Sequence, residues 1–426
     1  MPAGSRNDAA AFAYRQHALR LCSEPMTYRF ESVANPFAEL SATVAAAWNA
    51  LLARSQPAGS QHPFMRFEYL SAMTLAGCAT ASTGWKPYLM LLWDGAECAA
   101  ACALYVKSHS WGEYVFDFAW ADAYLRHGLP YYPKAVVAVP FTPVAGPRLL
   151  ARSVCERQML LRHVRDWCAE SGLSSLHVLF GSDDDLTAAV AVGMHRRLTV
   201  QFHWSNSNPP YENWEAFMAA LSQSKRKNVR QERRKVAEAG VTFRIQRGSA
   251  ITPMDWDFFY ACYEQTYREH GNAAYLTREF FHQLAADGAE AWVLFVAERN
   301  AQPIAASLIA LEHGAEGCVA YGRYWGALER VDCLHFEACY YQPLAWCIAH
   351  QVVRFEGGAQ GEHKLARALL PARTHSAHLM LDPRFDAAVA RFLEQEVKHI
   401  DARREWLDTR TPFRAPDAQV TPPETP

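Results

Sequence analysis

Short apolar runs bounded by turn-forming residues recur along both halves of the chain. In the first half one run covers residues 86–93, turns at Asp94 and Gly95, and returns over residues 99–107. Runs of this kind, separated by turn formers, are typical of a meander of antiparallel strands. A further apolar run predicts another strand over residues 114–120. The first half of the chain therefore predicts three consecutive strands.

The second half repeats this pattern. Residues 291–298 form an apolar run, residues 299–300 a turn, residues 303–311 the returning run and residues 318–324 the next strand. The two blocks superpose with a shift of about 204 positions. Repetition at a period as long as a domain predicts the duplication of a whole structural unit rather than a solenoid.

Helices are expected at matching places in the two halves. Residues 156–171 are amphipathic and precede a short apolar strand at 175–180. In the second half, residues 335–351 predict the comparable helix and residues 352–356 the comparable strand. Strands that alternate with helices predict an α/β (mixed α+β) fold in each half.

The length of the chain fits two domains. At 426 residues it exceeds one ordinary domain. We predict a flexible N-terminal extension (1–25), a first lobe (26–208), a helical segment with a basic helix (209–240), a second lobe (241–407) and a disordered proline-rich tail (408–426).

Composition narrows the class of protein. Forty-two basic residues balance 44 acidic ones, which argues against a general polyanion binder. The eleven cysteines form no C-x-x-C pair and lie mostly in apolar runs, which predicts buried, reduced thiols. No apolar run approaches the roughly 18 residues of a membrane span, and no secretory signal pattern opens the chain. We therefore expect a cytoplasmic protein.

Six strings resemble the bacterial FemAB-like family of GNAT acyltransferases: residues 107–124, 131–150, 201–206, 224–236, 322–342 and 355–385. The resemblance implies two tandem GNAT-like lobes and the transfer of an acyl or aminoacyl group to an amine of a small molecule or peptide. It implies aminoacyl-tRNA or acyl-CoA as co-substrate, with no tightly bound cofactor. The GNAT phosphate signature R/Q-x-x-G-x-G/A is matched only by residues 323–328, where Leu328 replaces a small residue, and this weakens the case for acyl-CoA.

Positive charge is concentrated between Lys225 and Lys235. Seven of these eleven residues are basic and Glu232 is the sole acid, in a helix expected to end near Ala239 and to be capped by Ser224. A solvated helix face usually interleaves acids with bases, so we favour contact with phosphates or an RNA backbone. The residues assigned to donor and phosphate binding are Lys225, Arg226, Lys227, Arg230 and Arg234, together with Arg323, Tyr324 and Arg367.

A second cluster follows the strand that ends at Glu356. Glycines there predict a tight loop that carries Glu362, His363, Lys364 and Arg367. His363 or Glu362 can act as a base, and Lys364 or Arg367 can stabilise an oxyanion or hold an anionic donor. A purely structural role is the alternative. The spacing of His375 and His378 also permits a metal site, but without a second compact ligand pair we predict none.

The third cluster joins Arg323 and Tyr324, at the end of a strand, with His335 and Glu337, at the start of the following helix. The N–H groups of a helix start can face an anion or an oxyanion. Pro343 removes a backbone donor and is expected to kink this helix. His335 and Glu337 therefore join the catalytic candidates, with packing as the alternative for His335.

Polar residues also interrupt the apolar strands of the first half. Asp117 lies between two phenylalanines in a predicted strand, and a charge there requires a cleft or a partner such as Arg148. The candidate acceptor-binding residues are His109, Glu113, Asp117, Trp120, Asp122, Tyr124 and Arg148. Two alternatives remain open for the whole chain: an acetyl-CoA-dependent N-acetyltransferase, and a catalytically inactive RNA-binding or scaffold protein.

Overall fold

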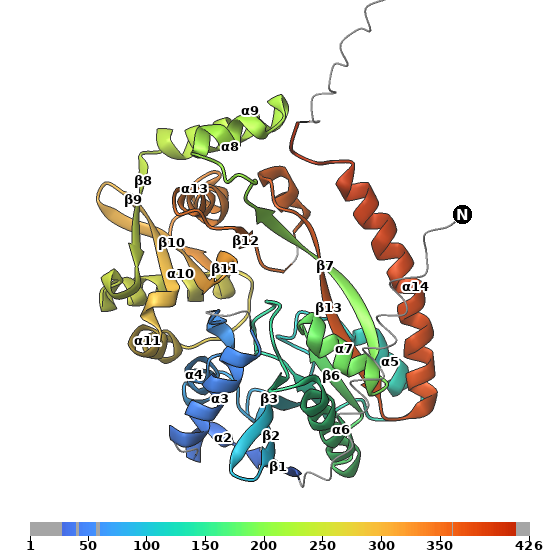
Figure 1. Cartoon of the computed structure of the whole chain (residues 1–426). Helices are drawn as coiled ribbons and strands as arrows, with labels where there is room; N and C mark the ends of the chain where they lie inside the picture. The colour runs from blue at the N-terminus through green and yellow to red at the C-terminus, as the bar shows by residue number, and fades with distance from the viewer. Residues whose placement is uncertain (1–27, 40–41, 57–59, 360, 415–426) are drawn as a thin grey trace, which may run out of the picture. The chain divides into compact units, whose positions relative to one another are not determined.

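The computed structural model contains two compact units (Figure 1). It describes residues 28–39, 42–56, 60–359 and 361–414. Unit 1 extends to Leu198 and includes His375–Gln395, and unit 2 comprises Thr199–Thr374 and the residues from Glu396 onward. The division falls inside two strands, β7 (His195–Ser205) and β13 (Leu370–Met380), whereas the sequence analysis placed one boundary near residue 208.

Unit 1 is built on strands in the order β1-β2-β3-β4-β6-β13. Pairing is antiparallel from β1 to β4, parallel between β4 and β6, and antiparallel between β6 and residues 376–380 of β13. The strands are β1 (Tyr28–Ala34), β2 (Trp85–Asp94), β3 (Glu97–Lys107), β4 (Lys134–Val137), β5 (Leu150–Ala151) and β6 (Ser175–Leu179). The helices are α2 (Pro36–Glu39), α3 (Ala42–Arg54), η1 (Pro63–Met65), α4 (Phe67–Leu75), α5 (Phe118–Arg126), α6 (Val154–Glu170) and α7 (Asp183–Ala191).

Unit 2 repeats this order as β8-β9-β10-β11-β12-β7, with the same sequence of antiparallel and parallel pairs. The strands are β8 (Val241–Arg247), β9 (Trp292–Arg299), β10 (Gln302–Gly314), β11 (Gly317–Ala327) and β12 (Arg354–Glu356). The helices are α8 (Trp214–Ala220), α9 (Gln223–Glu238), η2 (Gly248–Ala250), α10 (Pro253–Glu269), α11 (Arg278–Asp287), η3 (Ala289–Ala291), α12 (Leu334–Phe336), η4 (Glu337–Tyr341), α13 (Gln342–Ala349) and η5 (Glu362–Arg367). A long helix, α14 (Pro383–Asp408), follows β13. The predicted α/β duplication is confirmed.

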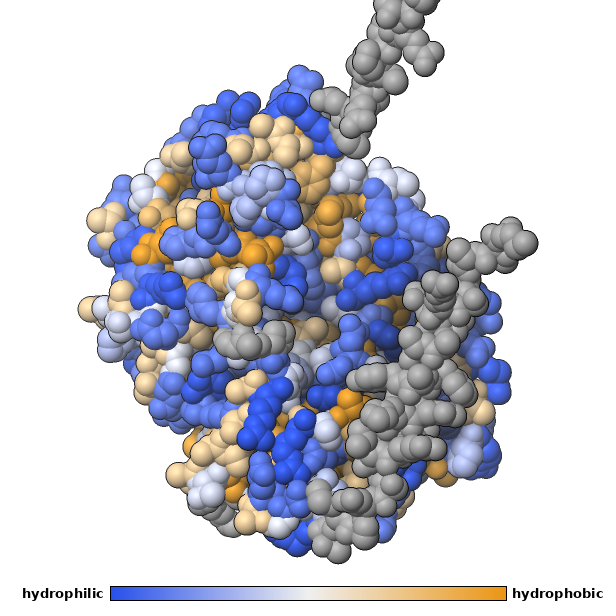
Figure 2. All heavy atoms as spheres, in the orientation of Figure 1, coloured by the Kyte–Doolittle hydropathy of each residue, from blue (hydrophilic) through white to orange (hydrophobic). Residues whose placement is uncertain are grey.

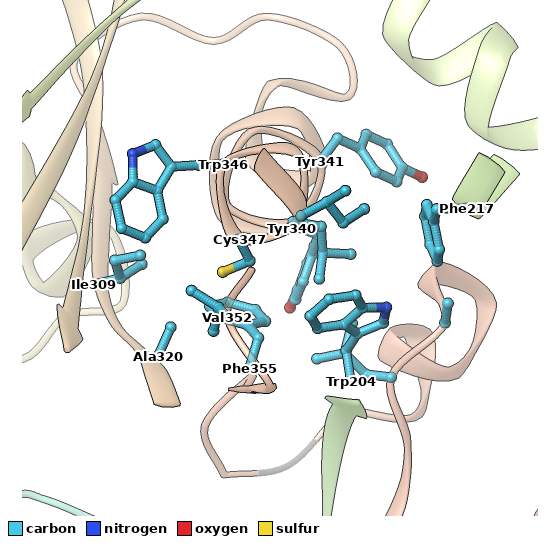
Figure 3. Packing of buried hydrophobic residues seen from close by; sticks show 14 of the residues in the cluster. Trp204, Phe217, Ile309, Ala320, Tyr340, Tyr341, Trp346, Cys347, Val352 and Phe355 are labelled. Carbon is cyan, nitrogen blue, oxygen red and sulfur yellow. The ribbon is translucent and has the colours of Figure 1, made fainter. Parts of the chain in front are cut away.

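Each unit has its own core. In unit 1 the alanine-rich strand β3 is buried along most of its length and contacts both α3 and α6, because small side chains allow the helices to approach closely. In unit 2 the core lies between α13 and strands β10 and β12. Figure 3 shows Trp346 beside Ile309, and Cys347 near Val352.

One predicted strand is wrong. Residues 114–120 form no strand: Tyr114 has a positive φ of 59°, which breaks an extended run, and Phe118 begins helix α5. The third strand of the meander is β4 instead. Asp117 therefore precedes a helix and does not alternate with Phe116 and Phe118 on a strand.

Among the cysteines that the structure describes, one departs from expectation. Nine are free thiols, whereas Cys155 is disulfide-bonded, so the prediction of reduced cysteines is wrong there. Within the described part of the chain, no helix combines the length and apolar character needed to cross a membrane. The predicted N-terminal extension (1–25) and residues 415–426 of the predicted tail (408–426) lie outside the described residues. Residues 408–414 of that tail are described: Asp408 ends α14, and Phe413 forms a β-bridge with Leu221.

Candidate active site

A cavity of about 450 Å³ opens in unit 2 where β11 and β12 part. Parallel pairing joins these strands only over Val319–Tyr321 and Arg354–Glu356. Beyond this pairing β11 continues to Ala327, whereas β12 ends and its backbone turns away at Gly357. The register between β10 and β11 shifts by one residue at this level, so Arg323 is the extra residue of a β-bulge. Bulges turn side chains and are common beside active sites. We name this space the bulge cavity.

One wall of the bulge cavity comes from a π-helical turn, η4, between α12 and α13. Pro343 lies in the first turn of α13 and has no N–H to continue a regular helix, so the predicted irregularity at this proline takes the form of a π turn. The Ser307 hydroxyl donates to the carbonyl of Ala338 in this turn at 2.6 Å. The turn brings Cys339 and Tyr340 to the cavity, together with His335 from α12.

His335 is the clearest candidate base. Its ring is half-buried, and neither of its nitrogens has a hydrogen-bond partner among the residues that the structure describes. Burial, helped by the nearby charges of His363, Arg367 and Lys364, lowers the pKa of His335 to about 4. The imidazole is therefore neutral at pH 7 and can accept a proton.

The opposite wall is the loop predicted from its glycines. Gly358 and Gly361 have φ values of 77° and 101°, which favour glycine, and the loop leads into η5. His363 lies 3.0 Å from the Tyr340 hydroxyl. Lys364 is 4% exposed and donates to the carbonyls of Gly358 and Ala359 at 2.9 and 3.1 Å. Burial lowers the pKa of Lys364 to about 8.

The other two catalytic candidates lie outside the bulge cavity. Glu362 pairs with Arg403 of α14 and is largely exposed. Glu337 is buried and accepts hydrogen bonds from Arg233 at 3.1 and 3.2 Å and from Gln342 at 2.7 Å. The structure thus brings His335, His363 and Lys364 together. Glu337 and Glu362 instead form ion pairs outside the cavity.

Of the donor candidates outside α9, Arg323 and Tyr324 line the bulge cavity. Arg367 does not: it is buried, its guanidinium lies 3.3 Å from the centre of the Phe336 ring, and it binds Glu232. The segment 323–328 lies mostly in β11, where a Cβ on Gly326 would approach the Cys262 carbonyl oxygen to 1.8 Å. This glycine allows α10 to pack on the strand, so the segment is not a phosphate-binding turn.

Helix α9 has an apolar side, where Val229 and Val236 are buried, and a charged side. Figure 2 shows hydrophilic residues over α9 at the top of the view. Lys227, Arg230 and Arg234 are exposed, whereas Lys225 and Arg226 are half-buried. The residue before the helix is Ser222 rather than the predicted cap Ser224, and its side chain makes no capping hydrogen bond.

Two of the seven acceptor candidates of unit 1, Glu113 and Asp117, belong to a buried polar network. Lys134, fully buried, donates to Glu113 and Ser110 at 2.8 Å and also to Asp117. The Tyr131 hydroxyl donates to Asp117 at 2.7 Å. Burial raises the pKa of Glu113 to about 7. Lys134 was not expected from the sequence, because nothing in its local pattern distinguishes a buried lysine from a solvated one.

The remaining acceptor candidates are dispersed. Trp120 packs on His378 inside unit 1, and Tyr124 stacks on Phe385. Asp122 is exposed, and His109 lies 3.1 Å from the Thr83 carbonyl. Arg148 is 1% exposed and donates to the carbonyls of Leu179 and Val144. The structure does not gather these residues at one surface of unit 1.

Residues missed from the sequence also line the bulge cavity, among them Ser307, Trp325, Cys339 and Tyr340. The repeated strand pattern predicted strands at or beside Ser307 and Trp325. The π turn that presents Cys339 and Tyr340 has no simple sequence pattern by which it could be predicted. No group of three or more His, Cys, Asp or Glu side chains that could hold a metal ion occurs among the described residues.

The chain thus consists of two repeated α/β units, and unit 2 contains a cavity at a strand bulge. The family model for FemAB-like proteins, described as peptidoglycan biosynthesis/recognition, matches residues 39–415. The chain therefore belongs to the FemAB-like family, and the resemblance noted from the sequence is confirmed.

Several solved structures are similar to the chain. The C-terminal domain of a putative lysylphosphatidylglycerol synthetase from Agrobacterium fabrum has a TM-score of 0.50 at 9% identity, over 83% of this chain and 96% of that one. The crystal structure of FemX gives 0.48 at 10% identity, over 84% and 100%. A tandem GNAT protein from the clavulanic acid biosynthesis pathway gives 0.43 at 12% identity, over 83% and 98%. No curated protein matches the sequence.

Proposed function

We propose that the protein transfers an aminoacyl group from aminoacyl-tRNA to an amine of a peptidoglycan precursor, and that the new bond forms in the bulge cavity. The observation that carries this proposal is the convergence of His335, His363–Tyr340 and Lys364 on one cavity at the bulge. The family description supports a peptidoglycan-related acceptor.

In the proposed reaction the acceptor amine attacks the ester carbonyl carbon of the donor. His335 takes the proton that the nitrogen loses; the ammonium of a tetrahedral adduct is more acidic than a free alkylammonium, which favours transfer to a weakly basic imidazole. Protonated Lys364 stabilises the negative charge that develops on the carbonyl oxygen. The carbon–oxygen ester bond then breaks, and the proton held by His335 passes to the departing ribose oxygen.

The matching place in unit 1 supports the assignment of chemistry to unit 2. In unit 1, β4 and β6 pair over residues 135–137 and 176–178. Just beyond β6, the segment that contains Gly146 lies beside the chain. Gly146 bridges to Gly181, and the Arg148 guanidinium donates to the Leu179 carbonyl at 3.1 Å. In unit 1 this backbone bridge and the Arg148 side chain lie just beyond β6, at the place that corresponds to the start of the cavity loop in unit 2.

Charge favours an RNA donor over acyl-CoA. The connection from β11 to α12, residues 328–333, contains Glu329, which pairs with Arg299, and Asp332, which lies 3.4 Å from Lys235. Both carboxylates are paired and Arg330 is the single basic residue of this connection, which therefore offers a pyrophosphate little positive charge. Helix α9, by contrast, exposes Lys227, Arg230 and Arg234, and Glu232 joins this helix to η5 through Arg367. A polyanion on α9 would lie against the element that bears His363 and Lys364.

The proposal is tested by incubating the purified protein with a peptidoglycan precursor peptide that has a free amine. One reaction contains tRNA charged with labelled amino acids, and a parallel reaction contains acetyl-CoA. Mass spectrometry of the peptide should show an aminoacyl addition only with the charged tRNA. His335→Ala should lower the rate about 100-fold, whereas His282→Ala, which removes an exposed histidine bound to Asp257, serves as the matched control.

Three results would change the assignment. An acetyl addition without an aminoacyl one would replace the donor by acyl-CoA. Full activity of His335→Ala would remove this residue from the mechanism. Tight binding of tRNA without transfer from either donor would favour the inactive RNA-binding alternative.

A further inference from the structure

Unit 2 contains a second, larger cavity of about 630 Å³ beside α9. Its walls include Trp214 and the buried side chains of Met218, Val236 and Val241, which come from α8, α9 and β8. Three arginines of α9 line it as well: Arg230, Arg233 and Arg234. We name this space the arginine pocket. Its volume is in the range of sites for small organic ligands.

Two of the three guanidinium groups are available to a ligand. Arg230 has no ion-pair or hydrogen-bond partner within the part of the chain that the structure describes, and Arg234 meets only the exposed Glu238, at 3.5 Å. Arg233 is engaged: it binds Glu337 and lies 4.8 Å from the centre of the Trp214 ring. Arginines spaced at i, i+3 and i+4 lie on one face of a helix.

The combination of apolar walls and guanidinium groups selects the chemistry of the occupant. Guanidinium groups bind phosphate oxygens through paired hydrogen bonds, and an aromatic wall such as Trp214 accepts a planar ring. We propose that the arginine pocket binds a nucleotide, with its phosphate on Arg230 and Arg234 and its ring against the apolar walls. The nucleotide is either free or part of an RNA strand.

The arginine pocket shares a structural element with the bulge cavity. Glu337 begins the π turn and lines the arginine pocket, while Cys339 and Tyr340 of the same turn line the bulge cavity. A phosphate that reaches Arg233 competes with Glu337 for its guanidinium. Occupancy of the pocket is thereby linked to the position of the π turn. This link alone rests on the proposed function, since nucleotide binding does not require the transfer reaction.

Binding is measured by calorimetry on the full chain without donor or acceptor, using AMP, adenosine and a 5′-phosphorylated RNA octanucleotide as probes. The test variant is Arg230→Gln with Arg234→Gln. The matched control is Arg391→Gln with Lys398→Gln, which removes the same charge from exposed positions of α14 that do not line the pocket. The test variant should weaken AMP or octanucleotide binding at least tenfold, the control less than twofold, and adenosine should bind at least tenfold more weakly than AMP.

Glu337→Gln gives a second readout, because it releases Arg233 and should strengthen nucleotide binding several-fold. Displacement of AMP by the octanucleotide, or binding of the octanucleotide alone, identifies RNA as the source, and AMP binding without displacement identifies a free nucleotide. Equal losses in the two double variants, or no binding of either phosphate-bearing probe, would overturn the proposal. Because the assay needs no transfer, such a failure would leave the proposed reaction standing.

Discussion

Glu232 accepts hydrogen bonds from Arg367 at 2.9 and 3.0 Å, and it is the only acid in the basic run of α9. The Tyr341 hydroxyl donates to the same carboxylate. This single acid therefore joins α9 both to η5, which bears His363 and Lys364, and to the π turn. A residue that looks like a minor interruption of a charged run is the connection between the proposed donor surface and the bulge cavity.

Glu232→Gln removes the charge and keeps the size of the side chain. We expect a loss of about 1–3 kcal/mol of stability, since Arg367 is nearly buried and loses its charged partner. The transfer rate should fall about tenfold, because η5 is no longer held against α9. Chemical denaturation and the transfer assay measure the two effects. Glu238→Gln, on the exposed side of α9, should change stability by no more than about 0.5 kcal/mol; similar losses in both variants would contradict the interpretation.

The sequence predicted the repeated fold well because alternating apolar strands and tight turns are local features. The two-residue turns after β2 and β9 are both marked by turn formers, Gly95 and Asn300, and both adopt positive φ values. The strand expected at 114–120 failed because an apolar run does not distinguish a strand from a loop followed by a buried helix. The positive φ of Tyr114 and the position of Asp117 directly before α5 prevent an extended strand over these residues.

The candidate site was predicted only in part. His363 and Lys364 were nominated in one cluster and His335 in another, and the structure brings all three to one cavity. Glu362 was nominated as a base in the glycine loop, and Glu337 as a residue at the start of the helix that follows the strand. Sequence does not reveal that their partners are Arg233 and Arg403, because these pairs join residues far apart in the chain.

The pH dependence of transfer should report Lys364. Burial lowers its pKa to about 8, so the side chain is protonated below that pH and loses its positive charge above it. If its charge stabilises the oxyanion, the rate constant kcat falls as the pH rises through about 8. Lys364→Arg keeps the charge throughout and should lose this alkaline limb, whatever its absolute rate. A limb near pH 8 that persists in Lys364→Arg would assign it to another group.

The buried network of unit 1 should be sensitive to loss of its cation. Lys134→Met leaves the carboxylates of Glu113 and Asp117 without their common partner in the protein interior. We expect a loss of about 3–5 kcal/mol of stability, the usual cost of breaking a buried ion pair on one side. Urea denaturation measures it. Lys86→Met on the exposed side of β2 is the matched control, and a comparably small change in both variants would show that the network contributes little.

Lys107, in the same region, gives unit 1 a distinct pH dependence. Its amine lies 3.5 Å from the centre of the Trp85 ring and donates to the Trp111 carbonyl at 3.2 Å, with Glu113, Asp117 and Lys134 as charged neighbours. Burial lowers its pKa from 10.5 to about 7.

Between pH 7 and 10.5 the unfolded chain therefore keeps a proton on Lys107 that the folded protein has lost. Stability contributed by this residue increases with pH across that interval, by up to about 1.4 kcal/mol per pH unit. The raised pKa of Glu113, about 7, acts below the interval and with the opposite sign, because there the folded protein holds the extra proton. Lys107→Met should flatten the rise in the free energy of unfolding between pH 7 and 9, measured by urea denaturation at each pH. If the free energy of unfolding depends on pH in the same way in the variant and the original protein, Lys107 is charged in the folded state. Its burial would then not lower its pKa, contrary to this prediction.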